Sequence, residues 1–333
     1  MNLLVSILIP AFNSEKWIRD TINSALAQTY SRTEIIIVDD GSTDNTLRIA
    51  REFESRRVKI ISQSNSGASA ARNKALALAQ GDYIQWLDAD DLLAPDKISD
   101  QIRPDNHRLD DRILLSSSYG TFYYRQNKAK FKVTKLWHDL SPIDWLLTKF
   151  TDNVWMHPAT WLVSRRLSEL AGPWDEMLSF DDDGEFFCRV VAVSNGVKFV
   201  PEAKCFYRVG NIDSLSWRRN DKALDSLFLS TTLCIDHLLA LENTERTKNA
   251  CLTLLQHSFG FFPPEGRHLI DKSNALARSL GGNILLPKES QLFFLTRHVI
   301  GWRWAEYLKT TLWKIEISIC KNWDKYLYDL SIG

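Results

Sequence analysis

Short β-branched runs alternate with segments of helical periodicity over the first hundred residues. Residues 5–9, 34–38, 58–62 and 82–87 have the composition of buried strands, and residues 14–28, 43–53 and 67–79 carry apolar side chains at helical spacing. Strand–helix–strand units of this kind predict an α/β fold with a Rossmann-like, mostly parallel sheet flanked by helices. In such a sheet, ligands bind beyond the carboxyl ends of the strands.

The pattern is less regular in the middle of the chain and becomes helical towards its end. Residues 113–133 are β-like and aromatic, and short helices are expected near 143–147 and 164–171. A helix over 182–194 precedes two strands, at 198–200 and 204–209. We predict a first domain over residues 1–216, with two halves of about 1–110 and 111–216, and a helical C-terminal region over 217–333.

Composition and charge narrow the classes of function. Lys plus Arg (41) equals Asp plus Glu (41), so no net positive field attracts nucleic acid, which we exclude as a partner. The five cysteines contain no CxxC pair and are expected to be reduced thiols in a cytoplasmic protein. Residues 3–9 enter a strand pattern at once, so no signal peptide is expected. No run of 18 apolar residues occurs, which leaves peripheral attachment to the cytoplasmic face of a membrane open.

The end of the chain carries one amphipathic pattern with two interpretations. Its apolar positions recur at helical spacing and form a single stripe: Ile300, Trp304, Leu308, Leu312, Ile315 and Ile319. A helix packed on its own domain through this stripe is the favoured interpretation. A helix that contacts a membrane surface is the alternative.

Two polar clusters follow the first and second predicted strands. The first is Pro10-Ala11-Phe12-Asn13, which suits a turn and helix cap or a wall against a nucleotide base. The second begins with Asp39-Asp40 and continues through a glycine turn. Two adjacent carboxylates exceed what a turn needs, and one of them could accept a hydrogen bond from a base or a ribose.

Two further acidic clusters follow the fourth strand and open a later helix. In extended backbone Asp88 and Asp90 share one face while Ala89 points away, which outlines a Mg²⁺ or Mn²⁺ site, although a solvated acidic turn has the same composition. Residues 181–183 are three successive aspartates at a helix start, where the helix dipole favours acids. Three successive aspartates are more than a helix cap requires, and one of them could act as a base.

An ordered set of motifs makes residues 5–216 resemble glycosyltransferase family 2, which has the GT-A fold. The motifs are Val5-Ser6-Ile7-Leu8-Ile9-Pro10-Ala11-Phe12-Asn13, Ile37-Val38-Asp39-Asp40-Gly41-Ser42-Thr43-Asp44, Gly67-Ala68-Ser69-Ala70-Ala71-Arg72-Asn73, Trp86-Leu87-Asp88-Ala89-Asp90-Asp91 and Gly172-Pro173-Trp174-Asp175-Glu176 leading to Asp182-Asp183. Each motif is weak alone, and the series in this order is specific. It covers about two thirds of the chain.

The resemblance implies roles for particular residues. The nucleotide-sugar site would comprise Pro10, Ala11, Phe12, Asn13, Asp39, Asp40, Gly67, Arg72, Asp88, Ala89 and Asp90. Asp88 and Asp90 would hold Mn²⁺ or Mg²⁺, and Asp183 would be the general base, with Asp182 beside it as the second candidate. This sequence departs from the family at Asp182, where relatives usually have Glu, and at Gly210, where relatives often have a His near the metal.

The implied reaction is transfer of a sugar, with inversion, from a nucleotide sugar to a hydroxyl of a glycan or lipid-linked saccharide in polysaccharide or glycoconjugate biosynthesis. UDP-sugar is the expected donor. Trp155, Trp161 and Trp174 are candidates to stack on sugars, although such tryptophans more often lie in a core, and His157 is expected to be structural. The rival functions are an inactive carbohydrate-binding or scaffold protein of the same fold and, less favoured, a sugar-phosphate nucleotidyltransferase.

Overall fold

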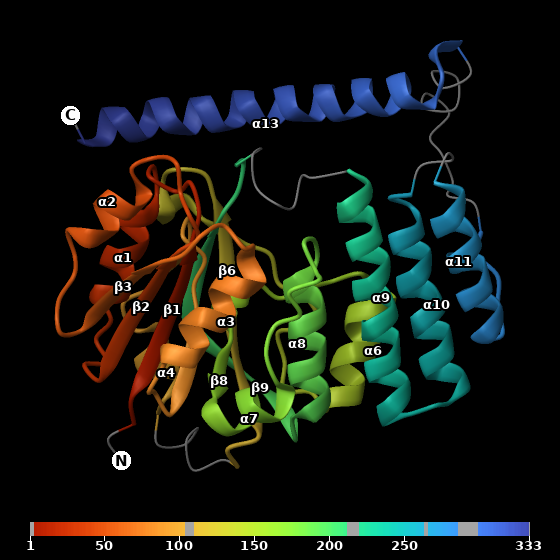
Figure 1. Cartoon of the computed structure of the whole chain (residues 1–333), viewed down its shortest axis with the longest axis horizontal. Helices are drawn as coiled ribbons and strands as arrows, with labels where there is room; N and C mark the ends of the chain where they lie inside the picture. Colours follow the sequence, from red (N-terminus) through yellow and green to blue (C-terminus); the bar gives the residue numbers. More distant parts are fainter. Residues whose placement is uncertain (1–2, 104–109, 212–219, 263–265, 286–298, 333) are drawn as a thin grey trace.

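A mixed sheet forms the centre of the molecule, with helices on both of its faces (Figure 1). The computed structural model describes residues 3–103, 110–211, 220–262, 266–285 and 299–332. The strands run in the order β3-β2-β1-β4-β8-β6-β9-β5, and β7 pairs with β6. Their bounds are β1 Val5–Ala11, β2 Thr33–Asp39, β3 Val58–Ser62, β4 Tyr83–Trp86, β5 Leu92–Leu93, β6 Ile113–Phe122, β7 Lys130–Phe131, β8 Leu162–Ser164 and β9 Gly196–Arg208.

The predicted α/β class is confirmed by the first four strands in the sheet. Strands β3, β2, β1 and β4 are parallel, as are β6 and β9, whereas β8, β5 and β7 join antiparallel. Alternate residues of β1 face two separate cores: Ile7 packs in one and Leu8 in the other. A strand buried on both faces needs a continuous apolar run, which is why these strands could be recognised in the sequence.

Helices cover the sheet and extend beyond it. Their bounds are α1 Ile18–Leu26, α2 Thr46–Arg51, α3 Ala68–Leu78, α4 Lys97–Gln101, α6 Pro142–Asp152, α7 Arg165–Ala171, α8 Asp182–Val193, α9 Asp221–Leu241, α10 Glu245–Phe259, α11 Arg267–Ser279 and α13 Trp302–Ile332, with 3₁₀ turns η1 at Gln126–Lys128 and η2 at Pro158–Thr160. Helix α9 packs against α8 and α10. The predicted boundary near residue 216 falls in residues 212–219, outside the described part of the chain.

Strand β9 differs from the prediction of two short strands. It runs without a break from Gly196 to Arg208 and pairs in parallel with β6 throughout. The register shifts where Val200 faces Ser117 and Lys204 faces Ser118, so residues 201–203 form a bulge. Because Pro201 has no N–H to donate to a neighbouring strand, the sequence around it resembled the end of one strand and the start of another.

Helix α9 is the one described helix that is long and apolar enough to cross a membrane, with 21 residues and a mean hydropathy of 1.4 over its most apolar window. The sequence predicted no spanning helix. Ile235 and Leu238 on α9 are buried in the same core as α8 and α10. Burial of this kind is also typical of a core helix in a globular protein, so length and composition alone are weak evidence for a span.

Helix α13 crosses the top of the molecule in Figure 1. Its side towards the body makes polar contacts: Asp324 accepts hydrogen bonds from the backbone N–H groups of Tyr124 (2.9 Å) and Arg125 (3.1 Å). The predicted apolar stripe lies exposed on the helix, so the expectation that it packs on the domain is wrong. Periodicity predicts a helix with an apolar side, but these polar contacts determine which side of α13 faces the body.

Candidate functional site

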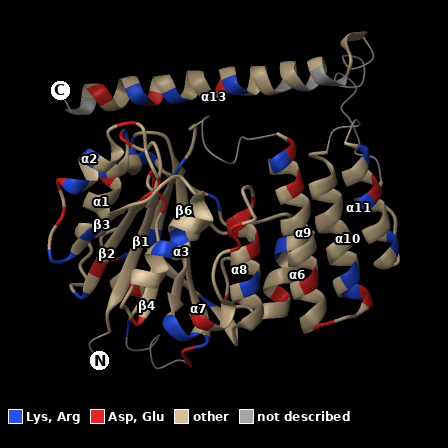
Figure 2. Cartoon of the chain, in the orientation of Figure 1, with Lys and Arg blue, Asp and Glu red and all other residues tan. Residues whose placement is uncertain are grey.

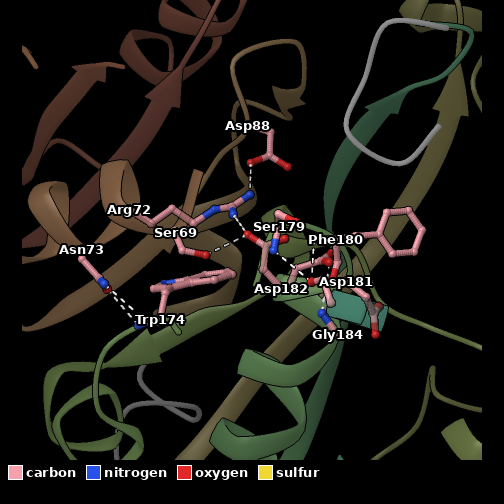
Figure 3. Close-up of polar contacts among 12 residues, drawn as sticks. Ser69, Arg72, Asn73, Asp88, Trp174, Ser179, Phe180, Asp181, Asp182 and Gly184 are labelled. Carbon is pink, nitrogen blue, oxygen red and sulfur yellow. Dashed lines mark hydrogen bonds and ion pairs between the residues drawn. The ribbon is translucent and has the colours of Figure 1, made fainter. Parts of the chain in front are cut away.

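Polar clusters from distant parts of the chain meet at the carboxyl-end edge of the sheet. Asp39 is the last residue of β2, the acidic loop of residues 88–91 follows β4, and Asp182 begins α8. Figure 3 shows Arg72, from α3, extending between Asp88 and Asp182. The structure therefore brings together two of the four predicted clusters around Arg72, and the clusters after β1 and β2 lie beside each other, with Ala11 paired with Asp39.

Asn13 links the end of β1 to the loop after β2. Its side-chain oxygen accepts a hydrogen bond from the Thr43 N–H (2.8 Å), and its own N–H donates to Ser42 Oγ (3.0 Å). Its φ of 46° is left-handed, a conformation that Asn tolerates better than most residues. Phe12, next to it, keeps 41% of its side chain exposed. Asn13 thus stabilises the loop, and Phe12 presents an apolar surface beside it.

The two adjacent aspartates after β2 have different environments. Asp40 uses both carboxylate oxygens, which accept from Gln63 Nε2 (2.8 Å), Ser66 N (2.9 Å) and Gly67 N (2.8 Å). Asp39 is 1% exposed, and its Oδ1 is buried without a hydrogen-bond partner among the described residues. Buried acceptors are nearly always hydrogen-bonded, so Asp39 Oδ1 is suited to a donor from a bound molecule, and Asp40 holds the loop before α3.

Arg72 is a buried bridge between two acidic segments. Its guanidinium, 6% exposed, lies 3.0 Å from Asp88 Oδ1 and 2.5 Å from Asp182 Oδ2, and it stacks 4.4 Å from the centre of the Trp174 ring. Ser69 Oγ also donates to Asp182 (3.2 Å). Charge-assisted hydrogen bonds of this kind are short and strong, so they hold the two side chains in a fixed arrangement. Asp182 therefore positions Arg72 in this structure.

The three aspartates at the start of α8 point to different partners. Asp181, with a left-handed φ of 59°, accepts from Ser230 Oγ on α9 (2.6 Å). Asp183 accepts only the N–H of Gly184 (3.0 Å) among the described residues, which leaves one oxygen available. Burial and the carboxylates of Asp182 and Asp181 raise the pKa of Asp183 to about 6. Of the three, Asp183 is the one to which no side chain donates a hydrogen bond among the described residues, and its raised pKa suits a general base.

The acidic loop after β4 is a turn and not the extended segment that the sequence suggested. The N–H of Asp91 donates to the backbone oxygen of Asp88 (3.1 Å), because β4 already ends at Trp86. The turn brings Asp91 back beside Asp88. Asp91 is fully buried and accepts the N–H of Arg208 at the end of β9 (2.8 Å).

His157 lies against this turn, although the sequence marked it as structural. Its Nε2 is 2.8 Å from Asp91 Oδ2 and 3.9 Å from Asp88 Oδ2. Its Nδ1 accepts the Ala159 N–H (3.2 Å), so the neutral ring carries its proton on Nε2, facing Asp91. Asp91 and His157 are the site residues that sequence reasoning missed. The signal in the sequence was the spacing of the two acids: Asp91 follows Asp88 by three residues, and a turn brings residues at that spacing together.

The loop concentrates negative charge in a way that suits a divalent cation. Ligand atoms of Asp88, Asp91 and His157 all lie within 4.8 Å of one another. Burial and the carboxylates of Asp91 and Asp88 raise the pKa of Asp90 to about 7. Carboxylate oxygens are preferred ligands of Mg²⁺ and Mn²⁺, so the residues present fit such an ion.

The three candidate tryptophans divide into core and surface residues. Trp161 and Trp174 are almost fully buried, which makes them core residues. Trp155 is 44% exposed, stacks on Tyr119 at 5.5 Å between ring centres and meets Tyr207 edge-on at 5.8 Å. The Tyr207 ring lies 4.4 Å, centre to centre, from the ring of His157, which contacts Asp91 in the acidic loop. Trp155 is therefore the tryptophan that can meet a bound sugar.

Comparison with known proteins identifies relatives of the chain. The sequence profile described as "Glycosyl transferase family 2" matches residues 6–154. An uncharacterised glycosyltransferase of Haemophilus influenzae is 30% identical over 217 residues, which is 64% of this chain and 82% of the relative. An uncharacterised glycosyltransferase of Rickettsia typhi is 32% identical over 193 residues, or 58% of this chain and 60% of the relative.

A named relative and a solved structure agree with this result. The Escherichia coli enzyme WfaP, a UDP-Glc:alpha-D-GlcNAc-diphosphoundecaprenol beta-1,3-glucosyltransferase, is 48% identical over 125 residues, which is 37% of this chain and 48% of WfaP. The fold matches the structure of Staphylococcus aureus TarS in complex with UDP-GlcNAc at a TM-score of 0.57 and 17% identity, over 84% of this chain and 88% of TarS. The chain thus spans well under two thirds of several curated relatives that it matches. The profile match and the Haemophilus relative together show that the chain belongs to glycosyltransferase family 2.

Proposed function

We propose that the protein transfers a sugar from a nucleotide sugar to a hydroxyl of a glycan or lipid-linked saccharide, with inversion at the anomeric carbon. The observation that carries this proposal is Asp183: it has one free carboxylate oxygen and a pKa of about 6, and it stands next to the Arg72 bridge to Asp88. We assign the catalytic domain to residues 1–216, with the donor held by the half before about residue 110 and the acceptor by residues 111–216.

The donor site would use the side chains that the structure leaves unsatisfied. Phe12 provides an apolar wall, and Asp39 Oδ1 provides a buried acceptor for a base N–H or a ribose hydroxyl. Arg72 would supply positive charge near the diphosphate while it holds Asp88 and Asp182. Asp40 and Asn13 would act indirectly, because their polar atoms are used to hold the loops around the donor.

In the proposed reaction, the acceptor hydroxyl oxygen forms a bond to the anomeric carbon as the bond to the diphosphate oxygen breaks. The bonding electrons leave with the nucleoside diphosphate, and the hydroxyl proton passes to Asp183. A base of this kind is most effective when its pKa lies near the working pH, and the raised pKa of Asp183 approaches that condition. A single displacement of this kind inverts the configuration of the sugar.

Asp88 and Asp90 would hold the divalent cation, and the carboxylate of Asp91 would orient the loop that carries them. A bound Mn²⁺ or Mg²⁺ supplies Lewis-acid stabilisation of negative charge on a diphosphate. His157 faces Asp91 with its protonated nitrogen, so we assign it to the positioning of Asp91 and not to direct ligation. This arrangement differs from relatives that have a His where this chain has Gly210.

A UDP-sugar and a lipid-linked acceptor are the substrate classes that we propose. Support comes from WfaP, whose name states a UDP-Glc donor and a diphosphoundecaprenol-linked acceptor, and from TarS, whose fold is shared and whose structure contains UDP-GlcNAc. An acceptor carried by a lipid is reached at a membrane surface, so we also propose a peripheral location on the cytoplasmic face. Cell-surface polysaccharide or glycoconjugate synthesis is the corresponding process.

Calorimetric titration of UDP into the protein, with Mn²⁺ and then with EDTA, tests the donor assignment. We expect UDP to bind in the presence of Mn²⁺ and GDP and dTDP to bind more weakly, with binding lost in EDTA. The variant Asp39→Asn should weaken UDP binding about tenfold, because a buried acceptor loses its charge next to the ligand. Asp44→Asn, in the same loop, is the matched control. If none of the nucleotides binds, the inactive scaffold is the correct interpretation.

The role of His157 is tested by the affinity for Mn²⁺ in the presence of UDP, measured as free Mn²⁺ by electron paramagnetic resonance. We expect His157→Ala to weaken Mn²⁺ binding about 10-fold, the lower end of the usual cost of losing an outer contact of a metal site, because His157 holds Asp91 and Asp91 orients the loop that carries the proposed ligands. His157→Gln keeps a side-chain N–H that can approach Asp91 and should recover part of the affinity. His138→Ala, an exposed histidine, is the control. Unchanged affinity in His157→Ala would contradict the assignment.

A further inference from the structure

Helix α13 is long, straight in Figure 1 and attached to the body by polar contacts on one side. Its 31 residues extend for about 46 Å at the usual rise per residue. Lys321 Nζ donates to the backbone oxygen of Gly210 (2.8 Å), and Asp324 forms an ion pair with Arg125 (2.8 Å). A Cβ on Gly210 would lie 3.0 Å from the Tyr123 ring and 3.3 Å from Lys321, so the missing side chain makes room for this helix.

The opposite side of α13 carries a row of exposed apolar residues that we name the outer stripe. Its members are Trp304, Leu308, Leu312, Ile315, Ile319, Trp323, Tyr326 and Leu330. All of them are between 44% and 66% exposed, and the stripe contains no charged residue. At 100° per residue they fall on one side of the helix, whereas Lys321 and Asp324, which bind the body, fall on the other.

The spacing of the outer stripe disfavours a left-handed coiled coil with a second copy of the helix. Its eight members span 26 positions in seven steps, about 3.7 residues per step. A left-handed coiled coil requires a repeat of about 3.5. A straight helix on a flat surface (about 3.6) and a right-handed pair of helices (about 3.67) both agree with the spacing, so the side-chain types decide between them.

The side chains of the stripe and its flanks suit a lipid surface. Trp304, Trp323 and Tyr326 are of the residue types that concentrate at membrane–water interfaces. Exposed charges lie beside the stripe and nearly balance, with Lys314 and Lys325 against Glu316 and Asp329, and Figure 2 shows α13 as mostly uncharged. The attraction would therefore come from burial of apolar side chains in the lipid and not from a strong net charge.

The helix also lies beside the candidate site. Tyr328 on α13 contacts the ring of Tyr124 (6.1 Å), which contacts Trp17 (5.2 Å). The Trp17 ring lies 4.0 Å from the guanidinium of Arg208, which donates to the backbone oxygen of Asp90 (2.8 Å). A flat surface against the outer stripe would thus lie close to the edge of the sheet where the acceptor is expected.

We propose that α13 lies in the plane of a lipid bilayer, with the outer stripe buried in the interface and the active-site edge of the sheet beside it. The partner is the lipid surface itself. The inference rests on the proposed function in one respect: binding to a lipid surface would give the site access to a lipid-linked acceptor. Attachment through a rigid helix with fixed contacts to the body would set the height and the orientation of the site above the membrane.

Vesicle flotation of the full-length chain tests the proposal. Purified protein is mixed with vesicles of phosphatidylcholine, and with vesicles that also contain phosphatidylglycerol, and centrifuged through a density gradient. We expect the protein to float with both. Ile319→Glu should reduce the bound fraction at least about tenfold, because it replaces a buried apolar side chain with a charge. Ser318→Glu adds the same charge at the adjacent exposed position, 100° around the helix, and should bind like the wild type.

Three outcomes would overturn the proposal. The wild type could remain at the bottom of the gradient with both kinds of vesicle. Ile319→Glu and Ser318→Glu could bind equally well. A concentration-dependent dimer that is lost in Ile319→Glu, without vesicle binding, would show that a second copy covers the stripe. UDP binding by the same preparations is measured in parallel, so a failed donor site and a failed membrane site give different results.

Discussion

The variant Asp183→Asn is expected to lose sugar transfer by about 10³-fold or more while it binds UDP and Mn²⁺ like the wild type. A positioned general base typically contributes 10²- to 10⁴-fold, and Asn cannot accept the hydroxyl proton. Asp183 holds only the N–H of Gly184 among the described residues, so its replacement leaves the Arg72 bridge intact. Transfer is measured as release of UDP from a UDP-sugar in the presence of acceptor, and binding is measured by calorimetry.

The neighbouring variant Asp182→Asn distinguishes a base from a positioning residue. Asp182 pairs with Arg72 and Ser69, so its loss should weaken UDP binding as well as transfer, because the guanidinium loses one of its two anchors. Asp183→Asn should affect transfer alone. If Asp183→Asn retained transfer and Asp182→Asn abolished it without a change in UDP binding, the base would be Asp182.

The pH dependence of transfer gives an independent check on the same residue. Burial and the carboxylates of Asp182 and Asp181 raise the pKa of Asp183 to about 6, and only its ionised form accepts a proton. The rate should therefore be constant above this pH and fall about tenfold per pH unit below it. The residual rate of Asp183→Asn should not show this acidic limb.

The sheet and the location of the site could be predicted because both depend on local patterns. A parallel strand that is buried on both faces requires a continuous apolar run, and the loops at its carboxyl end are identified by their position alone. The apolar runs therefore located β1, β2, β3 and β4 to within two residues at either end, and with them Asp39 and Asp88.

The division of roles inside each cluster could not be predicted, because it depends on contacts between distant segments. Asp39 and Asp40 are chemically identical neighbours, and only the loop at residues 63–67 decides that Asp40 is satisfied while Asp39 Oδ1 is not. Asp91 becomes part of the site because β9 offers the Arg208 N–H. His157 joins it from 66 positions further along the chain.

The outer stripe shows a different limit. Periodicity predicts that a helix has an apolar side. It does not say whether that side packs on the protein's own core or contacts a separate partner. Here the body binds the polar side of α13 through Lys321 and Asp324, and the apolar side remains exposed. Only the structure distinguishes a helix that buries its apolar side on its own domain from one that leaves this side exposed to a partner.

The second large effect is expected for Asp90→Asn, which should lower kcat about 10²- to 10³-fold, the usual cost of losing electrostatic stabilisation of a charged transition state. The carboxylates of Asp91 and Asp88 lie close enough to raise the pKa of Asp90, together with burial, to about 7, so three acids share one small region. A divalent cation would offset this repulsion and hold Asp90 ionised. Asn removes a charge from the shell and should weaken Mn²⁺ binding in parallel.

Asp96→Asn is the matched control, because Asp96 is an exposed acid six positions away that accepts from Thr29 Oγ1 (2.7 Å) and makes the same change of charge. Mn²⁺ affinity is measured by electron paramagnetic resonance with UDP present, and kcat is measured by UDP release. A loss of kcat with unchanged Mn²⁺ affinity would assign Asp90 to the sugar or ribose and leave the cation to Asp88 and Asp91. Near-wild-type turnover together with unchanged Mn²⁺ affinity in Asp90→Asn would contradict the proposed role of Asp90 in the active site.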